Sequence, residues 1–553
     1  MIYPKIPLAQ SIIEICYAKG VHDIVISPGS RNAPLTIGFT NNPQFSCYSI
    51  ADERCAAFFA LGIAQQKQKP VAVICTSGSA LLNYYPAFAE AFYSQIPFIV
   101  ISADRPFDKI DIGDGQTIRQ ENVFANHSLY NANLLEEASA ENDLFINEAI
   151  NLATVQKGPV HINVPFEEPL YQTTEQLLVD VSVIGVKIPA RTVSVEDVIA
   201  FSTLWNHSEK ILVLVGECAP NSVEQKWIDQ LAAFPSVVVL TETTSNLHHP
   251  SFINNIDTLI TPFTEKEFAE LQPKILLTFG GMIVSKRVKA FLRKYKPSHH
   301  WHVDELRAYN TFGALTQHFV VSPNQFFSQF MPHLKVVESL YKSTFEAIHQ
   351  DRKAKHIDYL DQVKFSDLKA FESILSALPK NNQLQISNSA AIRYAQLFDI
   401  EKTIQVFCNR GTSGIDGSTS TAIGAAVGSG IPTVLITGDV GFLYDSNALW
   451  NNYIPRNFKI ILMNNGGGGI FRILPGHEET ETFNTYFETS HCLTAAHLAK
   501  MYQLDYITAS NEDTLTKGLK QLFENNDQPA ILEVFTPTRE NNKVLLNYFK
   551  ALV

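Results

Sequence analysis

The sequence predicts an α/β protein with three doubly wound parallel-sheet domains, and three observations lead to this prediction. The chain has 553 residues, which is too long for one hydrophobic core and is typical of several domains. Short β-branched runs alternate with amphipathic stretches, and both faces of the runs are apolar, as expected for parallel strands covered by helices. Two stretches, near 171–195 (polar) and 336–365 (charged), divide this alternation into three series.

The first series contains four predicted strands. They are the β-branched or aromatic runs at 21–27 (VHDIVIS), 45–50 (FSCYSI), 71–76 (VAVICT) and 97–103 (PFIVISA). Amphipathic stretches between them predict helices over 8–19, 52–66 and 79–93.

The second and third series repeat the same alternation. We expect strands of the second series at 211–216, 236–241, 274–280 and 299–304. We expect strands of the third series at 384–387, 403–408, 433–439, 459–464 and 530–536. The predicted domains therefore span 1–180, 190–345 and 360–553.

The first and third series close in a similar way. GPVHINVPFEEP (158–169) and QPAILEVFTPTR (528–539) both place a proline before a closing strand and another after it. This similarity predicts two related sheets with a different sheet between them.

Composition excludes several classes of function. The net charge of −12 disfavours a nucleic-acid partner held by a general positive field. Seven cysteines without a CxxC pair indicate reduced thiols, which favours a cytoplasmic protein over a disulfide or zinc framework. No apolar run reaches the length of a membrane span, and the N-terminus has no signal-type core. The paired histidines at 248–249 and 299–300 are expected at turns or on the surface.

A glycine-rich stretch, MNNGGGGIF (463–471), follows one predicted strand of the third series. It matches neither GxGxxG nor GxxxxGK[ST], which disfavours a nucleotide-dependent oxidoreductase. Open α/β sheets bind ligands at the carboxyl ends of their strands. Asn465 and a carbonyl near Gly467 are oxygen ligands suited to Mg²⁺, and Asp439 after the preceding strand supplies a carboxylate. The alternative is a strand-end aspartate and a glycine turn without a ligand.

GD at 438–439 followed by NN at 464–465 resembles the motif of thiamine-diphosphate-dependent enzymes, with Val440 in place of the usual glycine. The resemblance implies Mg²⁺, or Mn²⁺, bound by Asp439, Asn465 and Gly467. It makes 1–180 the pyrimidine-binding domain, 190–345 the central domain and 360–553 the diphosphate- and metal-binding domain. The implied cofactor-binding residues are Glu53, Thr76, Gly78, Asn83, Ser413, Gly414, Ile415, Gly438, Asp439, Asn465, Gly467, Gly469 and Ile470.

Glu53, in SIADERCAAFFALG (49–62), resembles the catalytic glutamate of these enzymes. Thiamine chemistry needs a carboxyl group in an apolar setting to protonate the aminopyrimidine ring. The alternative is an ordinary first-turn glutamate that is stabilised by the helix dipole behind an Asp52 N-cap.

Arginines at predicted strand ends indicate the substrate class. Arg31, Arg105, Arg393 and Arg410 all follow strands in an acidic protein, and bidentate guanidinium groups suit carboxylates. Such a set predicts polycarboxylate substrates. Taken singly, each arginine could equally form a surface or interdomain salt bridge.

The segments SPGSRNAPL, ADRP, NRGTSGIDG, GDVGFLYDSNAL and NNGGGGIF closely resemble, in order, those of the 2-succinyl-5-enolpyruvyl-6-hydroxy-3-cyclohexene-1-carboxylate synthases of menaquinone biosynthesis. The resemblance covers essentially the whole chain. It implies a transferase that decarboxylates 2-oxoglutarate and adds the resulting succinyl carbanion equivalent to isochorismate in 1,4 fashion. The implied substrate-binding residues are Ser30, Arg31, Arg105, Gln116, Lys286, Arg287, Ser389, Arg393, Arg410, Phe471 and Leu474.

The resemblance also implies at least a homodimer, and we expect a homotetramer, because sites of this superfamily lie between the first domain of one subunit and the last domain of another. The nearest alternative function is an acetolactate-synthase-like 2-oxo-acid carboligase or decarboxylase, which needs fewer carboxylate anchors. A non-catalytic module that keeps the fold is a second alternative, disfavoured because Glu53 and Asp439 are both present.

Overall fold

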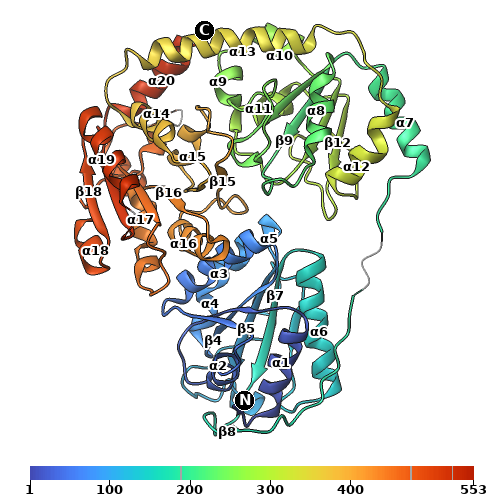
Figure 1. The fold of residues 1–553 in the computed structure, drawn as a ribbon, viewed down its shortest axis with the longest axis vertical. Coiled ribbons are helices and arrows are strands. Elements are labelled where there is room, and N and C mark those ends of the chain that lie inside the picture. Colours follow the sequence, from blue (N-terminus) through green and yellow to red (C-terminus); the bar gives the residue numbers. More distant parts are fainter. Residues whose placement is uncertain (187–189, 474–475, 477, 526) are drawn as a thin grey trace.

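The computed structural model contains three parallel sheets that follow one another along the chain (Figure 1). It describes residues 1–186, 190–473, 476, 478–525 and 527–553. The prediction of three α/β domains with parallel sheets is confirmed. None of the helices in these ranges combines the length and the apolar character that a membrane crossing requires.

The first domain is built on a six-stranded sheet with the order β3-β2-β4-β5-β7-β6. Its strands are β2 (Asp23–Ile26), β3 (Ser46–Ser49), β4 (Val71–Cys75), β5 (Phe98–Asp104), β6 (Asn131–Asn133) and β7 (Pro159–Pro165). Its α-helices are α1 (Pro7–Ala18), α2 (Ala33–Thr40), α3 (Glu53–Lys67), α4 (Ser79–Asn83), α5 (Tyr85–Ser94) and α6 (Ala140–Val155). A short antiparallel pair, β1 (Tyr3–Pro4) and β8 (Thr173–Thr174), lies beside it.

The central domain has a five-stranded sheet with the order β10-β9-β11-β12-β13. The strands are β9 (Ile211–Val215), β10 (Val237–Thr241), β11 (Ile275–Phe279), β12 (His299–Val303) and β13 (Leu315–Phe319). Its α-helices are α7 (Val195–Asn206), α8 (Gln225–Ala233), α9 (Ile256–Ile260), α10 (Glu265–Glu270), α11 (Lys286–Lys294) and α12 (Pro323–Phe330). Helix α13 (Tyr341–Leu360) then runs along the top of the molecule to the third domain (Figure 1).

The third domain has a six-stranded sheet with the order β15-β14-β16-β17-β19-β18. The strands are β14 (Gln383–Ile386), β15 (Gln405–Phe407), β16 (Thr433–Gly438), β17 (Lys459–Asn464), β18 (Asp505–Ala509) and β19 (Ala530–Phe535). The α-helices are α14 (Asp367–Ala377), α15 (Ala390–Ala395), α16 (Ser418–Ser429), α17 (Asp439–Tyr444), α18 (Ala496–Met501), α19 (Glu512–Glu524) and α20 (Asn541–Ala551).

The strands of the first and third sheets succeed one another in the same spatial order, whereas the central sheet differs. This agreement confirms the two related sheets that the similar closing segments predict. As a consequence, the ends of β4 and β16 occupy corresponding positions in the two domains, and each carries a predicted cofactor-binding segment.

The structure corrects three details of the sequence-based description. The expected helix over 79–93 is two helices, α4 and α5, that meet at Tyr84. Strands β6, β13 and β18 are not apparent in the sequence, because each is an edge strand that lacks a continuous apolar run. His300 is not a turn or surface residue: it is 1 % exposed within β12, and burial lowers its pKa to about 3.

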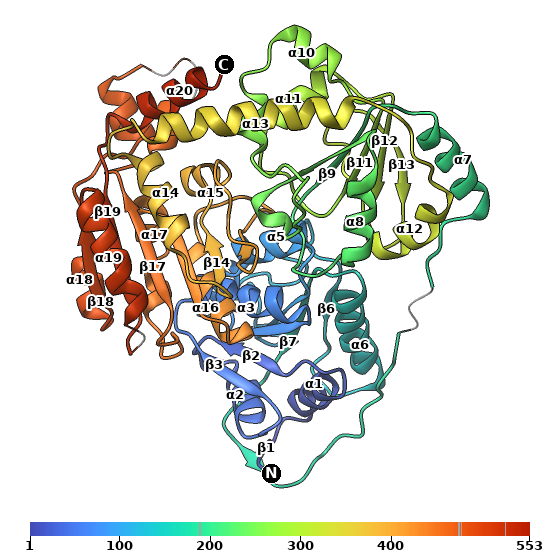
Figure 2. The ribbon, with the colours of Figure 1, turned by 45° about the horizontal axis from the view of Figure 1, so that its top comes forward.

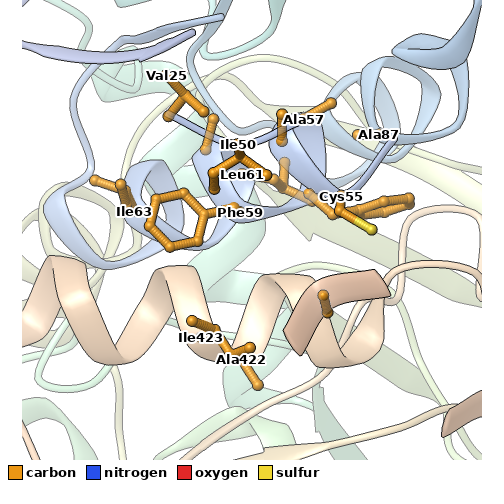
Figure 3. Packing of buried hydrophobic residues seen from close by; sticks show 14 of the residues in the cluster. Val25, Ile50, Cys55, Ala57, Phe59, Leu61, Ile63, Ala87, Ala422 and Ile423 are labelled. Atoms are coloured by element: carbon orange, nitrogen blue, oxygen red, sulfur yellow. The ribbon is translucent and has the colours of Figure 1, made fainter. Parts of the chain in front are cut away.

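The first and third domains are joined by the packing of α3 on α16, which lie side by side in both ribbon views (Figure 2). The backbones approach closely, because a Cβ atom on Gly424 would lie 1.9 Å from the Phe59 carbonyl oxygen. Figure 3 shows Phe59 of α3 next to Ala422 and Ile423 of α16 in this buried layer. The glycine therefore allows the two helices to pack closely, and this contact joins the first and third domains of one chain.

Candidate active site

The glycine-rich stretch and Asp439 meet at the ends of two neighbouring strands. Strands β16 and β17 are parallel partners, with Gly438 opposite Met463. The buried Asp439 carboxylate accepts the backbone N–H groups of Val440 at 2.7 Å, Gly466 at 2.8 Å and Gly467 at 3.0 Å. Burial raises the pKa of Asp439, while these N–H groups act in the opposite direction. The structure thus brings together the two segments that the sequence singles out.

Asp367 orients the side chain of Asn465. The Asn465 amide Nδ2 donates to Asp367 Oδ2 at 3.0 Å, and the other Asp367 oxygen accepts from Thr536 Oγ1 at 2.6 Å. A carboxylate only accepts hydrogen bonds, so the amide nitrogen faces Asp367 and the amide oxygen faces away. Burial raises the pKa of Asp367 to about 6. Asp367 lies far from the glycine-rich stretch in sequence, and no local pattern marks it.

The residues at this strand edge fit a magnesium-type cation. A carboxylate, an amide oxygen and a backbone carbonyl are the ligands such a cation prefers. A Cβ atom on Gly438 would meet no atom within 4 Å, so space is open beside Asp439. Among the described residues, no group of three or more His, Cys, Asp and Glu side chains could hold a metal. A cation here would therefore draw part of its ligands from amide, carbonyl and diphosphate oxygens.

Replacement of Asp367 by Asn is expected to weaken the binding of a divalent cation at Asn465 about 10- to 100-fold, because the Asn465 amide loses the partner that orients it. Titration of Mn²⁺ into the thiamine-diphosphate-loaded protein, followed by electron paramagnetic resonance, measures this affinity without reference to turnover. Asp513→Asn, on the exposed first turn of α19, is the matched control. An unchanged Mn²⁺ affinity in Asp367→Asn would contradict the orienting role.

Glu53 is the first residue of α3, directly after the N-cap Asp52, whose side chain accepts the N–H of Cys55 at 3.1 Å. Burial raises the pKa of Glu53, against the lowering effect of its own backbone N–H. The charge of Glu53 in turn raises the pKa values of the buried Cys75 and Tyr84, so its carboxyl faces the end of β4. Glu53 therefore occupies the first turn of a helix and also a partly desolvated position that favours its protonated form.

The segment after β4 lies against the segment that carries Gln116. Thr76 is buried, and its Oγ1 accepts the backbone N–H of Arg31 at 3.3 Å. Gly78 has φ +91°, and a Cβ atom there would lie 3.2 Å from the Gln116 carbonyl oxygen. The Gly78 N–H donates to Gln120 Oε1 at 2.8 Å, a buried side chain that sequence reasoning missed. Asn83, at the end of α4, is exposed.

The predicted substrate residues of the first domain lie around the same edge. Ser30 and Gln116 are exposed, whereas Arg31 is 4 % exposed. Arg31 donates to the Phe166 carbonyl at 2.9 Å and forms an ion pair with Glu168 at 3.2 Å. Burial and the charge of Arg105 lower the pKa of Arg31, so the two guanidinium groups are neighbours. Arg31 thus already has protein partners, and its ion pair with the exposed Glu168 lies within the first domain, as the surface salt-bridge alternative predicts.

A second cationic group forms between the third and central domains. Arg393 donates to the Ser389 carbonyl at 3.0 Å, and Arg410 donates to Asn388 Oδ1 at 2.6 Å. Burial and the charge of Arg410 lower the pKa of Arg393. Lys286 and Arg287 open α11 at the surface. Burial and the charge of Arg410 both lower the pKa of Lys289, so Lys289 lies near Arg410. The sequence did not single out Lys289.

Glu217 lies beside this group, after β9. Burial raises the pKa of Glu217 to about 8, the charge of Glu90 adds to this effect, and Arg410 opposes it. An acid whose folded pKa is raised binds its proton more tightly in the folded state. Its stabilising contribution is therefore complete below about pH 4.5 and is lost as the pH rises to about 8.

Glu217→Gln, which mimics the protonated acid, is expected to remove this loss. The melting temperature of the wild type should fall relative to that of the variant between about pH 4.5 and 8, and the difference should be constant above pH 8. Thermal unfolding across this range, with the exposed Glu209→Gln as control, measures it. Parallel curves for wild type and Glu217→Gln would contradict the raised pKa.

The remaining predicted residues flank the Asp439 edge, except one. Ile415 approaches Gly441, because a Cβ atom on that glycine would lie 3.6 Å from the Ile415 Cβ. Ser413 is exposed with φ +62°, and Asn388 Nδ2 donates to the Gly414 carbonyl at 2.7 Å. Gly469, Ile470 and Phe471 form a 3₁₀ turn, Gly469–Ile473, directly after the glycines. Leu474 lies outside the described residues.

The predicted residues thus form two groups in one chain. The first-domain group follows β2, β3, β4 and β5, and the other follows β14, β15, β16 and β17, together with Lys286 and Arg287 at the start of α11. Within the described residues, no hydrogen bond or ion pair joins Glu53 to Asp439, Asn465 or Arg410.

Comparisons with known proteins cover the whole chain. Residues 6–129 match the family model of the thiamine pyrophosphate enzyme N-terminal TPP binding domain. Residues 194–386 match the model described as the middle domain of thiamine pyrophosphate. Residues 389–534 match the model of the thiamine pyrophosphate enzyme C-terminal TPP binding domain. Relatives called 2-succinyl-5-enolpyruvyl-6-hydroxy-3-cyclohexene-1-carboxylate synthase are similar from end to end. Those of Flavobacterium johnsoniae and Flavobacterium psychrophilum are 66% and 68% identical over 100% of both chains. That of Porphyromonas gingivalis is 38% identical over 97% of this chain and 96% of its own.

Proposed function

The chain belongs to the 2-succinyl-5-enolpyruvyl-6-hydroxy-3-cyclohexene-1-carboxylate synthase family of thiamine-pyrophosphate-dependent enzymes, and we propose that it makes that compound from 2-oxoglutarate and isochorismate. 2-Oxoglutarate loses CO₂, and its remaining succinyl unit adds in 1,4 fashion to isochorismate. One observation of the structure carries the proposal furthest: the Arg393–Arg410 pair lies in the same domain as the Asp439–Asn465 edge. Two cationic groups for a dicarboxylate thus accompany a place for a diphosphate and its metal.

Thiamine diphosphate, when bound, supplies a carbon nucleophile that adds to the keto group of a 2-oxo acid and stabilises the negative charge left when CO₂ departs. We propose that Asp439, Asn465 and the Gly467 carbonyl hold Mg²⁺, or Mn²⁺, against the diphosphate. Glu53 would hold a proton against the aminopyrimidine ring, a role that its raised pKa favours. Thr76, Gly78 and Asn83 would line the pyrimidine, and Ile415 would support the cofactor from the opposite side.

The substrates are divided between the two groups of residues. Arg393 and Arg410 would bind the carboxylates of 2-oxoglutarate, because paired guanidinium groups match a dicarboxylate. Isochorismate would be bound by Ser30, Arg31, Arg105, Gln116, Lys286, Arg287 and Ser389, with Phe471 and Leu474 as the wall. Arg31 would keep its bonds to Phe166 and Glu168 and act chiefly through its charge.

We infer that a complete site needs two copies of the chain. Within one chain, Asp52 and Arg54 on either side of Glu53 bond to Asn447 and Tyr444, but no hydrogen bond among the described residues joins Glu53 to Asp439. The inference rests on the family resemblance, which implies a site between the first domain of one subunit and the last domain of another. The first domain of a partner would then supply Glu53, which makes a homodimer the minimum and leads us to expect a homotetramer. We assign residues 1–180 to the pyrimidine domain, 190–345 to the central domain and 360–553 to the diphosphate domain. The seven free cysteines favour a cytoplasmic setting.

The experiment that tests the proposal is a substrate comparison. The protein, loaded with thiamine diphosphate and Mg²⁺, is incubated with isochorismate and either 2-oxoglutarate or pyruvate, while isochorismate absorbance and CO₂ are followed. We expect equal losses of isochorismate and gains of CO₂ with 2-oxoglutarate, and little turnover with pyruvate. Turnover of pyruvate without consumption of isochorismate would instead support the acetolactate-synthase-like function.

A further inference from the structure

We propose that Glu90, a residue of the first domain, is a positioning residue that sets where Arg410 binds 2-oxoglutarate. Glu90 lies on α5 and does not belong to any of the predicted site segments. It acts on the third-domain segment 409–414 of the same chain, which we term the Arg410 loop. The inference rests on the proposed function, because it takes Arg410 as a carboxylate-binding residue.

Glu90 is 1 % exposed, and its carboxylate is used almost entirely by the Arg410 loop. The backbone N–H of Gly411 donates to Oε1 at 2.7 Å. The backbone N–H and the hydroxyl of Thr412 donate to Oε2 at 2.6 Å and 2.7 Å. A fourth bond, from Ser94 Oγ at 2.8 Å, comes from the next turn of α5. Two consecutive N–H groups that converge on one buried carboxylate form a strong, charge-assisted contact.

This contact fixes the backbone on which Arg410 is mounted. The peptide bond is planar, so a fixed Gly411 N–H also fixes the carbonyl of Arg410 and limits the direction of its side chain. The contact tolerates only glycine at 411, because a Cβ atom there would lie 2.7 Å from the Glu90 carbonyl oxygen and 2.8 Å from Ser94 Oγ. Helix α5 and the Arg410 loop therefore touch backbone to backbone.

Asn388 holds the other side of the loop. Its Nδ2 donates to the carbonyls of Asn409 and Gly414, both at 2.7 Å, and its Oδ1 accepts from Arg410 Nη1 at 2.6 Å. Asn388 thus fixes both ends of the loop and the tip of the arginine, whereas Glu90 fixes the middle. With both in place, the Arg410 guanidinium is held before substrate arrives, which reduces the ordering cost of binding.

The charges around Glu90 agree with this role. Glu90 raises the pKa of the neighbouring Glu217, while Arg410 lowers it. Glu217 and Arg410 thus both lie close to the Glu90 carboxyl group, which accepts three hydrogen bonds from the loop. A glutamine at 90 would place an amide donor against the donors of the loop.

The test compares the kinetics of Glu90→Gln with those of the wild type for each substrate separately. Loss of the hydrogen bonds between the Glu90 carboxylate and the Arg410 loop should lower kcat/KM for 2-oxoglutarate about 10- to 100-fold, because misplacement of a binding group by an ångström has effects of this size. The KM for isochorismate should stay within about twofold of the wild-type value. A general disturbance of the site would instead change the kinetic constants for both substrates. Ser94→Ala removes only the bond within α5 and should leave both values near those of the wild type.

A double-mutant cycle shows whether Glu90 acts through Arg410. In an Arg410→Lys background, Glu90→Gln should cause little further loss for 2-oxoglutarate, because coupled residues are not additive. If Glu90→Gln does not accumulate as folded protein, Thr412→Val, which deletes only the hydroxyl bond, should still lower kcat/KM for 2-oxoglutarate selectively.

Equal losses for both substrates, or full additivity with Arg410→Lys, would overturn the inference and leave Glu90 as a structural contact. The proposed function fails in a different way: the wild type itself would not consume isochorismate with 2-oxoglutarate.

Discussion

Replacement of Glu53 by Gln is expected to lower kcat by about 100- to 10,000-fold, the range for loss of a positioned proton donor. The variant should stay folded, because Glu53 is only partly buried and accepts no hydrogen bond from another side chain of the described residues. Glutamine keeps the size of the side chain but cannot release or take up the proton. Steady-state turnover with both substrates, together with thermal unfolding, gives the two values.

Glu512→Gln is the matched control for this prediction. Glu512 also begins a helix, α19, directly after a capping residue, Asn511, but it is exposed. If Glu53 served only the helix dipole, both substitutions would change stability by a few tenths of a kcal/mol and leave kcat alone. Full activity in Glu53→Gln would therefore assign the residue to helix stability.

Replacement of Asp439 by Asn is expected to abolish the metal-dependent binding of thiamine diphosphate. Asp439 is the one carboxylate among the three proposed ligands, so this substitution removes the negative charge that they offer the cation. We expect the cofactor affinity measured in Mg²⁺ to fall at least about 100-fold and to approach the affinity measured with a chelator. Isothermal titration with and without Mg²⁺ measures both.

A second buried aspartate separates this effect from a loss of stability. Asp445 follows α17, and its carboxylate accepts the N–H of Ser420 at 2.7 Å, the Ser420 hydroxyl at 2.8 Å and the Cys55 thiol, none of which is a proposed ligand. Asp445→Asn should lower the melting temperature and keep the Mg²⁺ dependence of cofactor binding. Strong Mg²⁺-dependent binding in Asp439→Asn would refute the proposed metal site.

The fold could be predicted from the sequence because buried parallel strands appear in it as short apolar runs. Runs such as ILVLV at β9 are apolar on both faces, and the structure buries every residue of that strand. Edge strands carry no such signal: NAN at β6 is polar and short, and only its pairing with β7 makes it a strand. The division of 79–93 at Tyr84 coincides with Pro86 in the first turn of α5, because a proline interrupts the hydrogen bonds of a continuous helix and hydrophobic periodicity does not report it.

Only part of the candidate site could be predicted from the sequence. Asp439 and the glycines stand next to strand ends, so the order of the sheet brings them together. Asp367, Glu90 and Asn388 support the predicted residues through hydrogen bonds across long sequence separations. Residues of these types are common in helices and turns, and what distinguishes them is burial with specific partners. Such contacts exist only in the folded chain, so a sequence pattern cannot reveal them.

The most direct test of the account follows the carbon atoms of uniformly ¹³C-labelled 2-oxoglutarate. The wild-type protein, with thiamine diphosphate, Mg²⁺ and unlabelled isochorismate, is sampled by mass spectrometry. We predict one labelled CO₂ for each labelled succinyl unit that is joined to the isochorismate skeleton. Labelled succinic semialdehyde as the sole product, with isochorismate unchanged, would contradict the account, because it would show decarboxylation without the carbon–carbon bond.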